Sequence, residues 1–194
     1  MQLREDSLER ALEMLGRVLE QRGFEYEIVV VGGSALLLLG IIHRPTNDLD
    51  VLALINHGEY VLAQPLPTGL VEAAVDVAAV LGLAPGWLNN GPTAQIQSGL
   101  PAGFQSRVDT RTYRTLVVHI ASRVDLIFLK LYAAVDHWPG QGKHVDDLRH
   151  LVPTQSELLE AARWVRDQDI GPEFPEIVAA VLKAFGVDDA EARF

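Results

Sequence analysis

The chain has 194 residues, of which 48% are hydrophobic and 22% charged, and its 16 basic and 26 acidic residues leave a formal net charge of −10. This length suits one globular core with a helical extension, and the composition is that of a folded chain. The absence of cysteine excludes disulfide scaffolds, cysteine-ligated zinc, iron–sulfur sites and thiol nucleophiles, and the excess of acid disfavours a sequence-independent nucleic-acid coat.

The N-terminal segment is charged throughout, and the longest apolar run, residues 35–39, is far too short to span a bilayer. We therefore expect a cytoplasmic protein that has no membrane partner.

Hydrophobic periodicity predicts alternating helices and strands over residues 1–121, which we interpret as an α/β core. In chain order we expect a helix through residues 8–19 that ends at Gly23, a strand over 28–31, a tight turn, a helix over 35–39, a strand over 48–55, a helix over 69–82, a loop over 84–101 and a hairpin over 106–120. Asp6 and Glu9 resemble a start box for the first helix.

Helix signals dominate residues 122–194, which we interpret as a C-terminal helical region that completes an active-site cleft. Capping-box patterns at Ser122 with Asp125 and at Thr154 with Glu157 predict two helix starts. Further helices are expected over residues 141–151 and 172–186. Together the elements predict an α+β fold, with a small mixed sheet packed with helices.

Gly32, Gly33 and Ser34 lie between a predicted strand and a predicted helix. Glycines let the backbone come close to a ligand, and unpaired N–H groups at a helix start can bind phosphate. The pattern alone is more typical of an ordinary turn at the end of a buried strand.

Asp48 and Asp50 lie at the head of the second strand, where the period of two points both carboxylates to one face. A divalent cation such as Mg²⁺ binds carboxylate oxygens and relieves the repulsion between them. The alternative is a solvated strand end.

Lys130 shares a helical face with apolar residues, so we expect its side chain to be at least partly buried. A desolvated ammonium either pairs with a carboxylate or binds an anion, unless the side chain extends to water. On the next helix Asp147 lies closer than Asp146 to the apolar face, which makes Asp147 the expected partner of Lys130.

Other polar residues give weaker signals. Arg107, Arg111 and Arg114 could form a basic patch, but an ordinary solvated hairpin explains them as well. His137 and His150 are not spaced from His144 as metal ligands on adjacent helical turns are, so we do not predict a histidine metal site.

The order of these features resembles the nucleotidyltransferase superfamily. Residues 31–35 (VGGSA) and 44–51 (RPTNDLDV) are similar to its GGSxxx…RxTxDxD signature, and Lys130 and Asp147-Leu148 match the helices that follow. Within the superfamily the chain resembles the minimal prokaryotic AbiEii/MenT-like toxin branch (DUF6036-like), also through residues 100–107. The resemblance covers about residues 25–151.

The resemblance implies a polymerase-β-like nucleotidyltransferase fold and a catalytic set of Asp48, Asp50, Lys130 and Asp147. Asp48 and Asp50 would bind Mg²⁺, and one of them could accept the proton of the acceptor hydroxyl. Lys130 would stabilise negative charge, and Asp147 would orient Lys130 or help to activate the acceptor.

The resemblance also implies a nucleotide-binding set. Gly32, Gly33 and Ser34 would hold the phosphates of a nucleoside triphosphate, while Arg44 and Thr46 would position the aspartate turn. Members of the toxin branch modify transfer RNA at its 3′ end and are usually encoded with a cognate antitoxin protein.

Two departures from the family pattern bear on this interpretation. Other members of the superfamily add a third carboxylate from a later strand; we expect that strand at about Leu116 to Ile120, where His119 stands and no acid is present. His144 stands where many relatives carry an aspartate.

The sequence therefore leaves three hypotheses. The first is a Mg²⁺-dependent nucleotidyltransferase, a toxin that acts on transfer RNA. The second is a nucleotide-binding, non-catalytic or antitoxin-type partner that retained the fold. The third is a structural domain with a decayed site, in which Lys130 pairs with a carboxylate.

Overall fold

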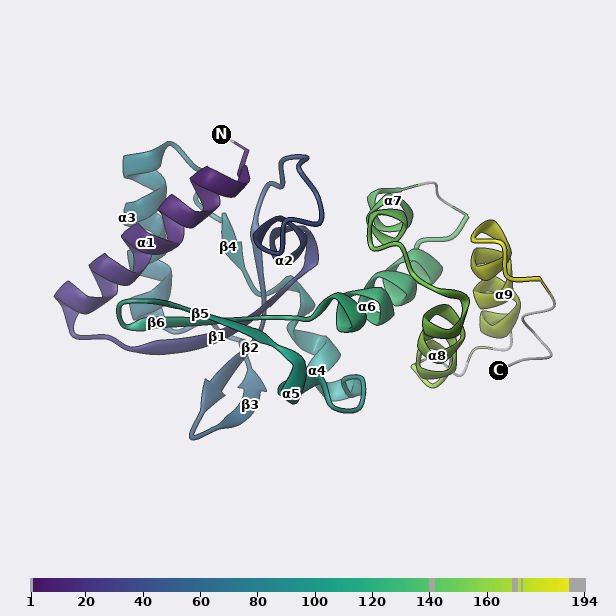
Figure 1. Ribbon diagram of the computed structural model, residues 1–194. Coiled ribbons are helices and arrows are strands. Elements are labelled where there is room, and N and C mark those ends of the chain that lie inside the picture. The colour runs from purple at the N-terminus through teal and green to yellow at the C-terminus, as the bar shows by residue number, and fades with distance from the viewer. Residues whose placement is uncertain (1, 140–141, 169–170, 172, 189–194) are drawn as a thin grey trace. The chain divides into compact units, whose positions relative to one another are not determined.

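The computed structural model describes residues 2–139, 142–168, 171 and 173–188. The chain forms two compact units, Met1–Ser122 and Arg123–Phe194 (Figure 1). Each unit is described by itself below.

The first unit combines a sheet with short and long helices. Its elements are α1 (Glu5–Arg22), β1 (Tyr26–Val31), α2 (Gly32–Leu38), β2 (Leu49–Asn56), β3 (Glu59–Leu62), α3 (Thr68–Leu81), β4 (Leu88–Asn89), the 3₁₀ helix η1 (Gly91–Ala94), α4 (Gln95–Ser98), α5 (Phe104–Arg107), β5 (Asp109–Tyr113) and β6 (Leu116–Ile120).

The described strands form one mixed sheet in the order β3-β2-β1-β6-β5, with β4 paired to β2. The strand β1 is antiparallel to β2 and parallel to β6, while β4 runs parallel to β2. The prediction of an α+β unit with a small mixed sheet is confirmed.

The helix α1 packs its apolar stripe on the sheet beside α3 (Figure 1). Its leucines are fully buried, and the helix ends at Gly23, whose φ of +72° closes the last turn as predicted. The predicted start box is wrong: the hydroxyl of Ser7 accepts a hydrogen bond from the backbone N–H of Arg4 at 2.8 Å, so the box lies two residues earlier than Asp6 and Glu9 imply.

Two strands and one helix boundary differ from the sequence prediction. The strand β3 follows β2 through a turn at His57 and Gly58, and β4 lies inside the segment predicted as a loop. Gly32 and Gly33 are the first residues of α2 rather than a turn before it. Short elements carry too few residues to show a period, which explains these differences.

The second unit consists of helices. They are α6 (Arg123–Asp136), α7 (Lys143–His150), α8 (Gln155–Arg166) and α9 (Phe174–Ala184). The helix α6 packs against α7, α8 and α9. The predicted starts at Gln141 and Pro172 lie outside the described residues.

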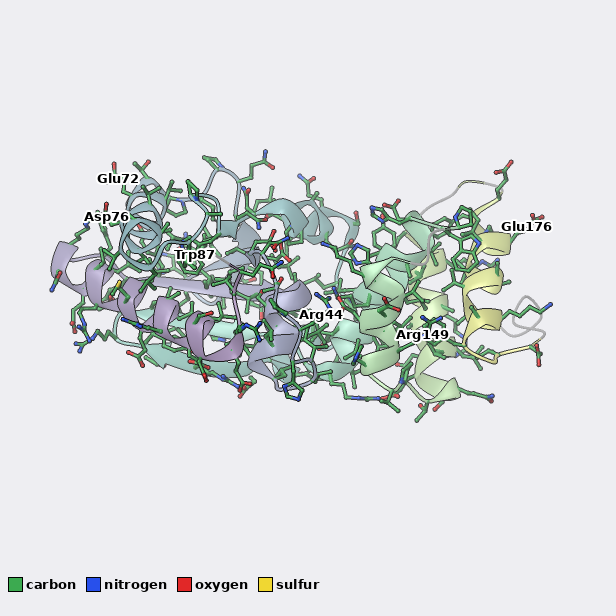
Figure 2. All side chains as sticks on the ribbon, turned by 90° about the horizontal axis from the view of Figure 1, so that it is seen from above. Arg44, Glu72, Asp76, Trp87, Arg149 and Glu176 are labelled. Carbon is green, nitrogen blue, oxygen red and sulfur yellow. The ribbon has the colours of Figure 1, made fainter. Side chains whose placement is uncertain are left out.

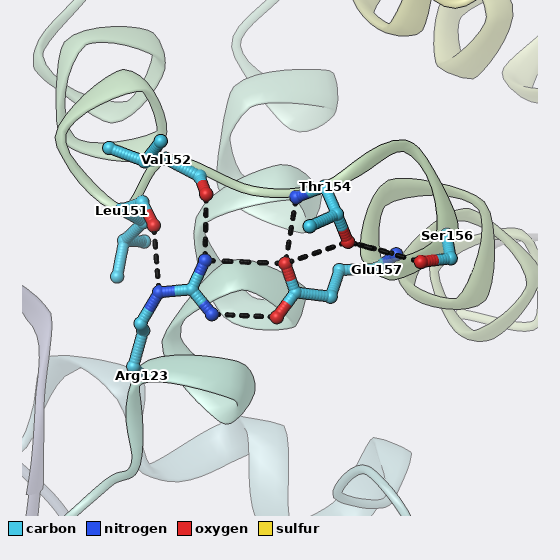
Figure 3. Close-up of polar contacts among 6 residues, drawn as sticks. All are labelled: Arg123, Leu151, Val152, Thr154, Ser156 and Glu157. Atoms are coloured by element: carbon cyan, nitrogen blue, oxygen red, sulfur yellow. Dashed lines mark hydrogen bonds and ion pairs between the residues drawn. The ribbon is translucent and has the colours of Figure 1, made fainter.

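The predicted capping box of α8 is confirmed. The hydroxyl of Thr154 accepts a hydrogen bond from the backbone N–H of Glu157, and the Glu157 carboxylate accepts one from the backbone N–H of Thr154 at 2.7 Å. Arg123 joins this box by donating to both carboxylate oxygens of Glu157 and to the carbonyls of Leu151 and Val152 (Figure 3). One guanidinium thereby ties the first turn of α6 to the link between α7 and α8.

Candidate active site

Asp48 and Asp50 flank Leu49 at the head of β2. Leu49 is fully buried, whereas both aspartates are half-buried. Asp48 makes no hydrogen bond or ion pair with the residues that the structure describes, so its carboxylate keeps its oxygens available to a ligand.

Asp50 is held from both sides of its strand. Its backbone lies level with Val31, the last residue of β1, and with Asn89 of β4. The side-chain amide of Asn89 donates a hydrogen bond to Oδ1 of Asp50 at 3.2 Å. Three neighbouring strands therefore bring their polar or terminal residues together at one edge of the sheet.

The glycine pair at the start of α2 leaves room for the side chains of two predicted site residues, Asp50 and Thr46. Gly32 has a φ of +73°, and a Cβ at this position would overlap Oδ2 of Asp50. A Cβ at Gly33 would lie 2.9 Å from the hydroxyl of Thr46. The backbone thus comes close to Asp50 and Thr46 in a way that only glycine permits.

Ser34 connects α2 to β2 from a fully buried position. Its hydroxyl donates to the carbonyl of Val31 at 3.2 Å and accepts from the backbone N–H of Asp50 at 3.4 Å. A hydroxyl with these two partners fixes the backbone of Asp50, so Ser34 acts on the site through the position of Asp50.

Thr46 and Arg44 belong to the segment that leads into β2. Thr46 is buried, and its backbone exchanges hydrogen bonds of 2.7 and 2.9 Å with Leu3, which anchors the segment to the N-terminal end of the unit. Arg44 is half-buried and donates to the carbonyl of Pro45 at 3.4 Å. The structure therefore brings Gly33 and Thr46 together, and Gly32 and Asp50 together.

These residues fit a hard divalent cation. Mg²⁺ takes oxygen ligands, keeps several waters and uses one or two carboxylates together with substrate phosphates. The two half-buried carboxylates, one of them without a partner in the described part of the chain, match that requirement. No group of three or more His, Cys, Asp or Glu suited to a metal occurs among the described residues, and within that part of the chain the candidate site has two carboxylates.

The strand expected at about Leu116 to Ile120 is present, and it carries no acid. The segment Leu116–Ile120 does form β6, but β6 pairs with β1 and not with β2. His119 of this strand contacts Thr110 at 3.0 Å and Glu27 at 3.1 Å. The strand beside Asp50 is β4, and the residue level with Asp50 there is Asn89, which sequence reasoning missed because a two-residue strand has no readable period.

In the second unit, Lys130 and Asp147 form a buried ion pair. The ammonium of Lys130 donates to Oδ2 of Asp147 at 2.7 Å, and the two residues are 5% and 0% exposed. Asp146 is exposed and pairs with Arg149 at 3.0 Å. The predicted burial of Lys130 and the choice of Asp147 over Asp146 are confirmed.

His144 lies near this pair on α7. Burial and, next, the charge of Lys130 lower the pKa of His144 to about 4, so the ring is neutral at pH 7. Its Nδ1 is buried and has no hydrogen-bond partner among the described residues.

Arg111 and Arg114 belong to the β5–β6 hairpin, whereas Arg107 is the last residue of α5. Arg111 pairs with Glu9 at 2.6 Å, and Arg114 pairs with Glu20 at 2.7 Å, both across to α1. Arg107 donates to the carbonyl of Ala102 at 2.8 Å. Acids of α1 therefore neutralise Arg111 and Arg114, two of the three side chains that could have formed a patch.

A model of a family of nucleotidyltransferases of unknown function (DUF6036) matches residues 6–137. The chain belongs to this family. No curated protein and no solved structure matches the chain.

The region matched to the nucleotidyltransferase family contains Asp48, Asp50, Asn89 and Lys130, whereas Asp147 lies beyond it. Membership supports a transferase at the level of the superfamily. None of the described helices has the length and apolar character needed to cross a membrane.

Proposed function

We propose that the chain is a Mg²⁺-dependent nucleotidyltransferase that transfers a nucleoside monophosphate from a nucleoside triphosphate to an acceptor hydroxyl. The observation that carries this proposal is the carboxylate pair, Asp48 and Asp50, at the sheet edge beside Gly32, within the family match. Family membership alone gives only the broader class of transferase.

The reaction forms one phosphorus–oxygen bond and breaks another. The acceptor oxygen attacks the α-phosphorus, the bond from that phosphorus to the bridging oxygen breaks, and pyrophosphate leaves. A carboxylate of the Asp48 and Asp50 pair takes the proton of the acceptor hydroxyl. Mg²⁺ held by Asp48 and Asp50 would neutralise the charge of the triphosphate and polarise the α-phosphate.

The remaining residues of the first unit hold the reacting groups in place. Gly32 and Gly33 provide the close backbone approach, and Ser34 acts through the backbone of Asp50, since its hydroxyl already binds there. Arg44 and Thr46 position the segment that leads to Asp48. The resemblance implies that these residues form the nucleotide-binding set; in this proposal Ser34 supports Asp50 and does not contact the phosphates.

For the second unit, Lys130 is proposed to stabilise negative charge and Asp147 to orient Lys130. The 2.7 Å ion pair supports the orienting role. That Lys130 joins Asp48 and Asp50 around one anion stays a prediction. The resemblance extends the proposal to transfer RNA 3′ ends as acceptor and to a toxin with a cognate antitoxin in the cytoplasm.

The test is transfer of label from each α-³²P-labelled nucleoside triphosphate, with Mg²⁺, to total transfer RNA. We expect incorporation by the wild type, loss with a chelator and recovery with added Mg²⁺. Asp48→Asn and Asp50→Asn should each reduce the rate of transfer by about 10² to 10⁴-fold, because each replaces a negatively charged carboxylate, which can bind the metal and accept a proton, with a neutral amide. Asp109→Asn is the matched control, an exposed aspartate on β5.

Equal incorporation by the wild type and both variants would refute the proposal. The alternative, a non-catalytic nucleotide-binding or antitoxin-type partner, is favoured by one observation: the residue level with Asp50 on β4 is the neutral Asn89, which adds no third carboxylate. Calorimetric titration separates them, because the partner would bind triphosphate in a Mg²⁺-dependent way with no turnover. Absence of binding would contradict both.

A further inference from the structure

The short strand β4 belongs to a segment that is anchored on both sides. Trp87 is fully buried, and its indole N–H donates to the carbonyl of Ala74 in α3 at 2.9 Å. Figure 2 shows Trp87 inside the first unit, whereas Glu72 and Asp76 lie on the outer side of α3. The anchor fixes the chain just before Asn89.

The other side is fixed by the segment after β4. The amide of Asn90 donates to the carbonyl of Ala63 at 2.7 Å, and the hydroxyl of Thr93 accepts from the N–H of Ala63 at 2.8 Å. Anchors on both sides hold β4 against β2 although β4 has only two residues. Asn89 therefore has a set position beside Asp50.

The side chain of Asn89 also has a set orientation. Its Oδ1 accepts the backbone N–H of Gly91 at 2.8 Å, so its amino group is the end that faces Oδ1 of Asp50. The opposite orientation would lose the bond to Gly91 and would turn an acceptor oxygen toward a carboxylate oxygen. Asn89 is thus a fixed donor to Asp50.

Both oxygens of Asp50 consequently have defined places. Oδ1 takes the Asn89 donor, and Oδ2 lies in the space that the missing Cβ of Gly32 leaves. An acid at position 89 would instead put a second negative charge at hydrogen-bond distance from Asp50, which is unfavourable without a cation. The neutral amide keeps the number of carboxylates at this edge at two.

We propose that Asn89 is a positioning residue that orients Asp50 for a divalent cation and limits the site to two carboxylates. The proposal rests on the proposed function. A purely structural role for Asn89 predicts that every substitution harms the site or leaves it unchanged. A positioning role predicts opposite effects of two substitutions on cation affinity.

The experiment measures binding of Mn²⁺ alone to the full chain by electron paramagnetic resonance of the free ion. Asn89→Ala should weaken the affinity for Mn²⁺ about tenfold or more, the effect of one lost hydrogen bond to a charged acceptor. Asn89→Asp should strengthen it about tenfold, because a third carboxylate raises the charge of the ligand set. Asn90→Asp, which makes the same change of charge in the next residue, should not strengthen it.

The outcomes separate this proposal from the proposed function. If the wild type binds Mn²⁺, Asp50→Asn does not, and both Asn89 variants bind as the wild type does, the role of Asn89 is refuted and the metal site stands. If Asn89→Asp and Asn90→Asp strengthen binding equally, net charge explains the effect and the proposal fails. If the wild type and Asp50→Asn bind Mn²⁺ equally or not at all, the site fails together with the proposal. Circular dichroism verifies the fold of each variant, and Asn89→Asp serves if Asn89→Ala does not fold.

Discussion

Lys130 and Asp147 show how a residue's burial defines its chemistry. Both lie almost without exposed surface, and an ion pair of 2.7 Å joins them. Burial removes the hydration of both charges, and their attraction compensates that loss only while both are present. The pair is what a decayed structural site would also contain, so its presence alone does not separate the hypotheses, whereas the effect of changing it on catalysis does.

Substitution of Lys130 with Met should destabilise the second unit by about 3–5 kcal/mol, because the buried Asp147 carboxylate loses its ammonium partner. The double variant Lys130→Met with Asp147→Leu should recover most of that loss, since neither charge then remains buried. Urea denaturation of the wild type, both single variants and the double variant measures the coupling between the two residues. Equal losses in Lys130→Met and the double variant would show that packing, and not charge, is responsible.

The sequence predicted the burial of a single side chain correctly where that residue lies in a regular helix. Helical spacing predicted that Lys130 is buried and that Asp147 rather than Asp146 faces inward. Asn89 gave no such signal, because it lies in a two-residue strand whose partner β2 is remote in sequence. Only the fold reveals that Asn89 and Asp50 are neighbours.

Among the elements, α1 lies unusually close to the sheet at one point. Gly16 is buried in α1, and a Cβ there would overlap the backbone carbonyl oxygen of Tyr113 in β5. Above and below, Glu9 and Glu20 of α1 pair with arginines of the same hairpin. The glycine sets the distance at which those ion pairs can form.

Gly16→Ala tests this contact. Alanine favours an isolated helix by about 1 kcal/mol over glycine, but a backbone carbonyl cannot rotate away as a side chain can, and overpacking costs about 1–3 kcal/mol. Because the overlap is with a rigid carbonyl, we take the upper part of that range, about 2–3 kcal/mol, and expect a net loss of about 1–2 kcal/mol in the free energy of unfolding, measured in urea. Gly86→Ala is the control, since a Cβ there meets no atom within 4 Å and should change stability little. A Gly16→Ala protein as stable as the wild type would contradict the contact.

The network of Arg123 and Glu157 links elements of the second unit through one carboxylate (Figure 3). Hydrogen bonds from Arg123 are the main cause that lowers the pKa of Glu157 to about 2, from 4.5. Between pH 4.5 and 2, Glu157 binds a proton in the unfolded chain but stays ionised in the folded chain. The stability that the Glu157 carboxylate contributes is therefore fully present above pH 4.5 and is lost as the pH falls to 2.

Glu157→Gln should therefore be less stable than the wild type by about 1–2 kcal/mol at pH 7, a value reduced for the exposure of Arg123. The difference should shrink steadily between pH 4.5 and 2. Thermal unfolding at several pH values measures it. Asp146→Asn, which removes an exposed carboxylate, should stay close to the wild type throughout; a constant difference for Glu157→Gln would refute the linkage.

The hydrophobic periodicity of the sequence predicted the long amphipathic elements, whereas it did not predict the short ones. The helix α1, the helix α3 and the capping box of α8 agree with the sequence patterns that predicted them. The strands β3 and β4 were not predicted, because their pairing with β2 stabilises them and their own residues have no distinguishing pattern.

For the whole molecule, the division into two compact units and the mixed sheet describe the architecture, and the family match at residues 6–137 gives the class. The match includes the whole sheet. The catalytic proposal therefore depends chiefly on the first unit, while the buried pair of the second unit awaits the tests above.

The sequence by itself determined the α+β class, the long helices, the strand at whose head the paired aspartates lie and the inward face of Lys130 and Asp147. These features follow from the periodicity of hydrophobic residues within one helix or strand, because that periodicity decides which side chains share a face. The tertiary structure alone decided that β4 rather than β6 lies beside β2, and that Asn89 therefore contacts Asp50. Strand order depends on how distant segments bury their apolar faces together, and no local pattern records that choice.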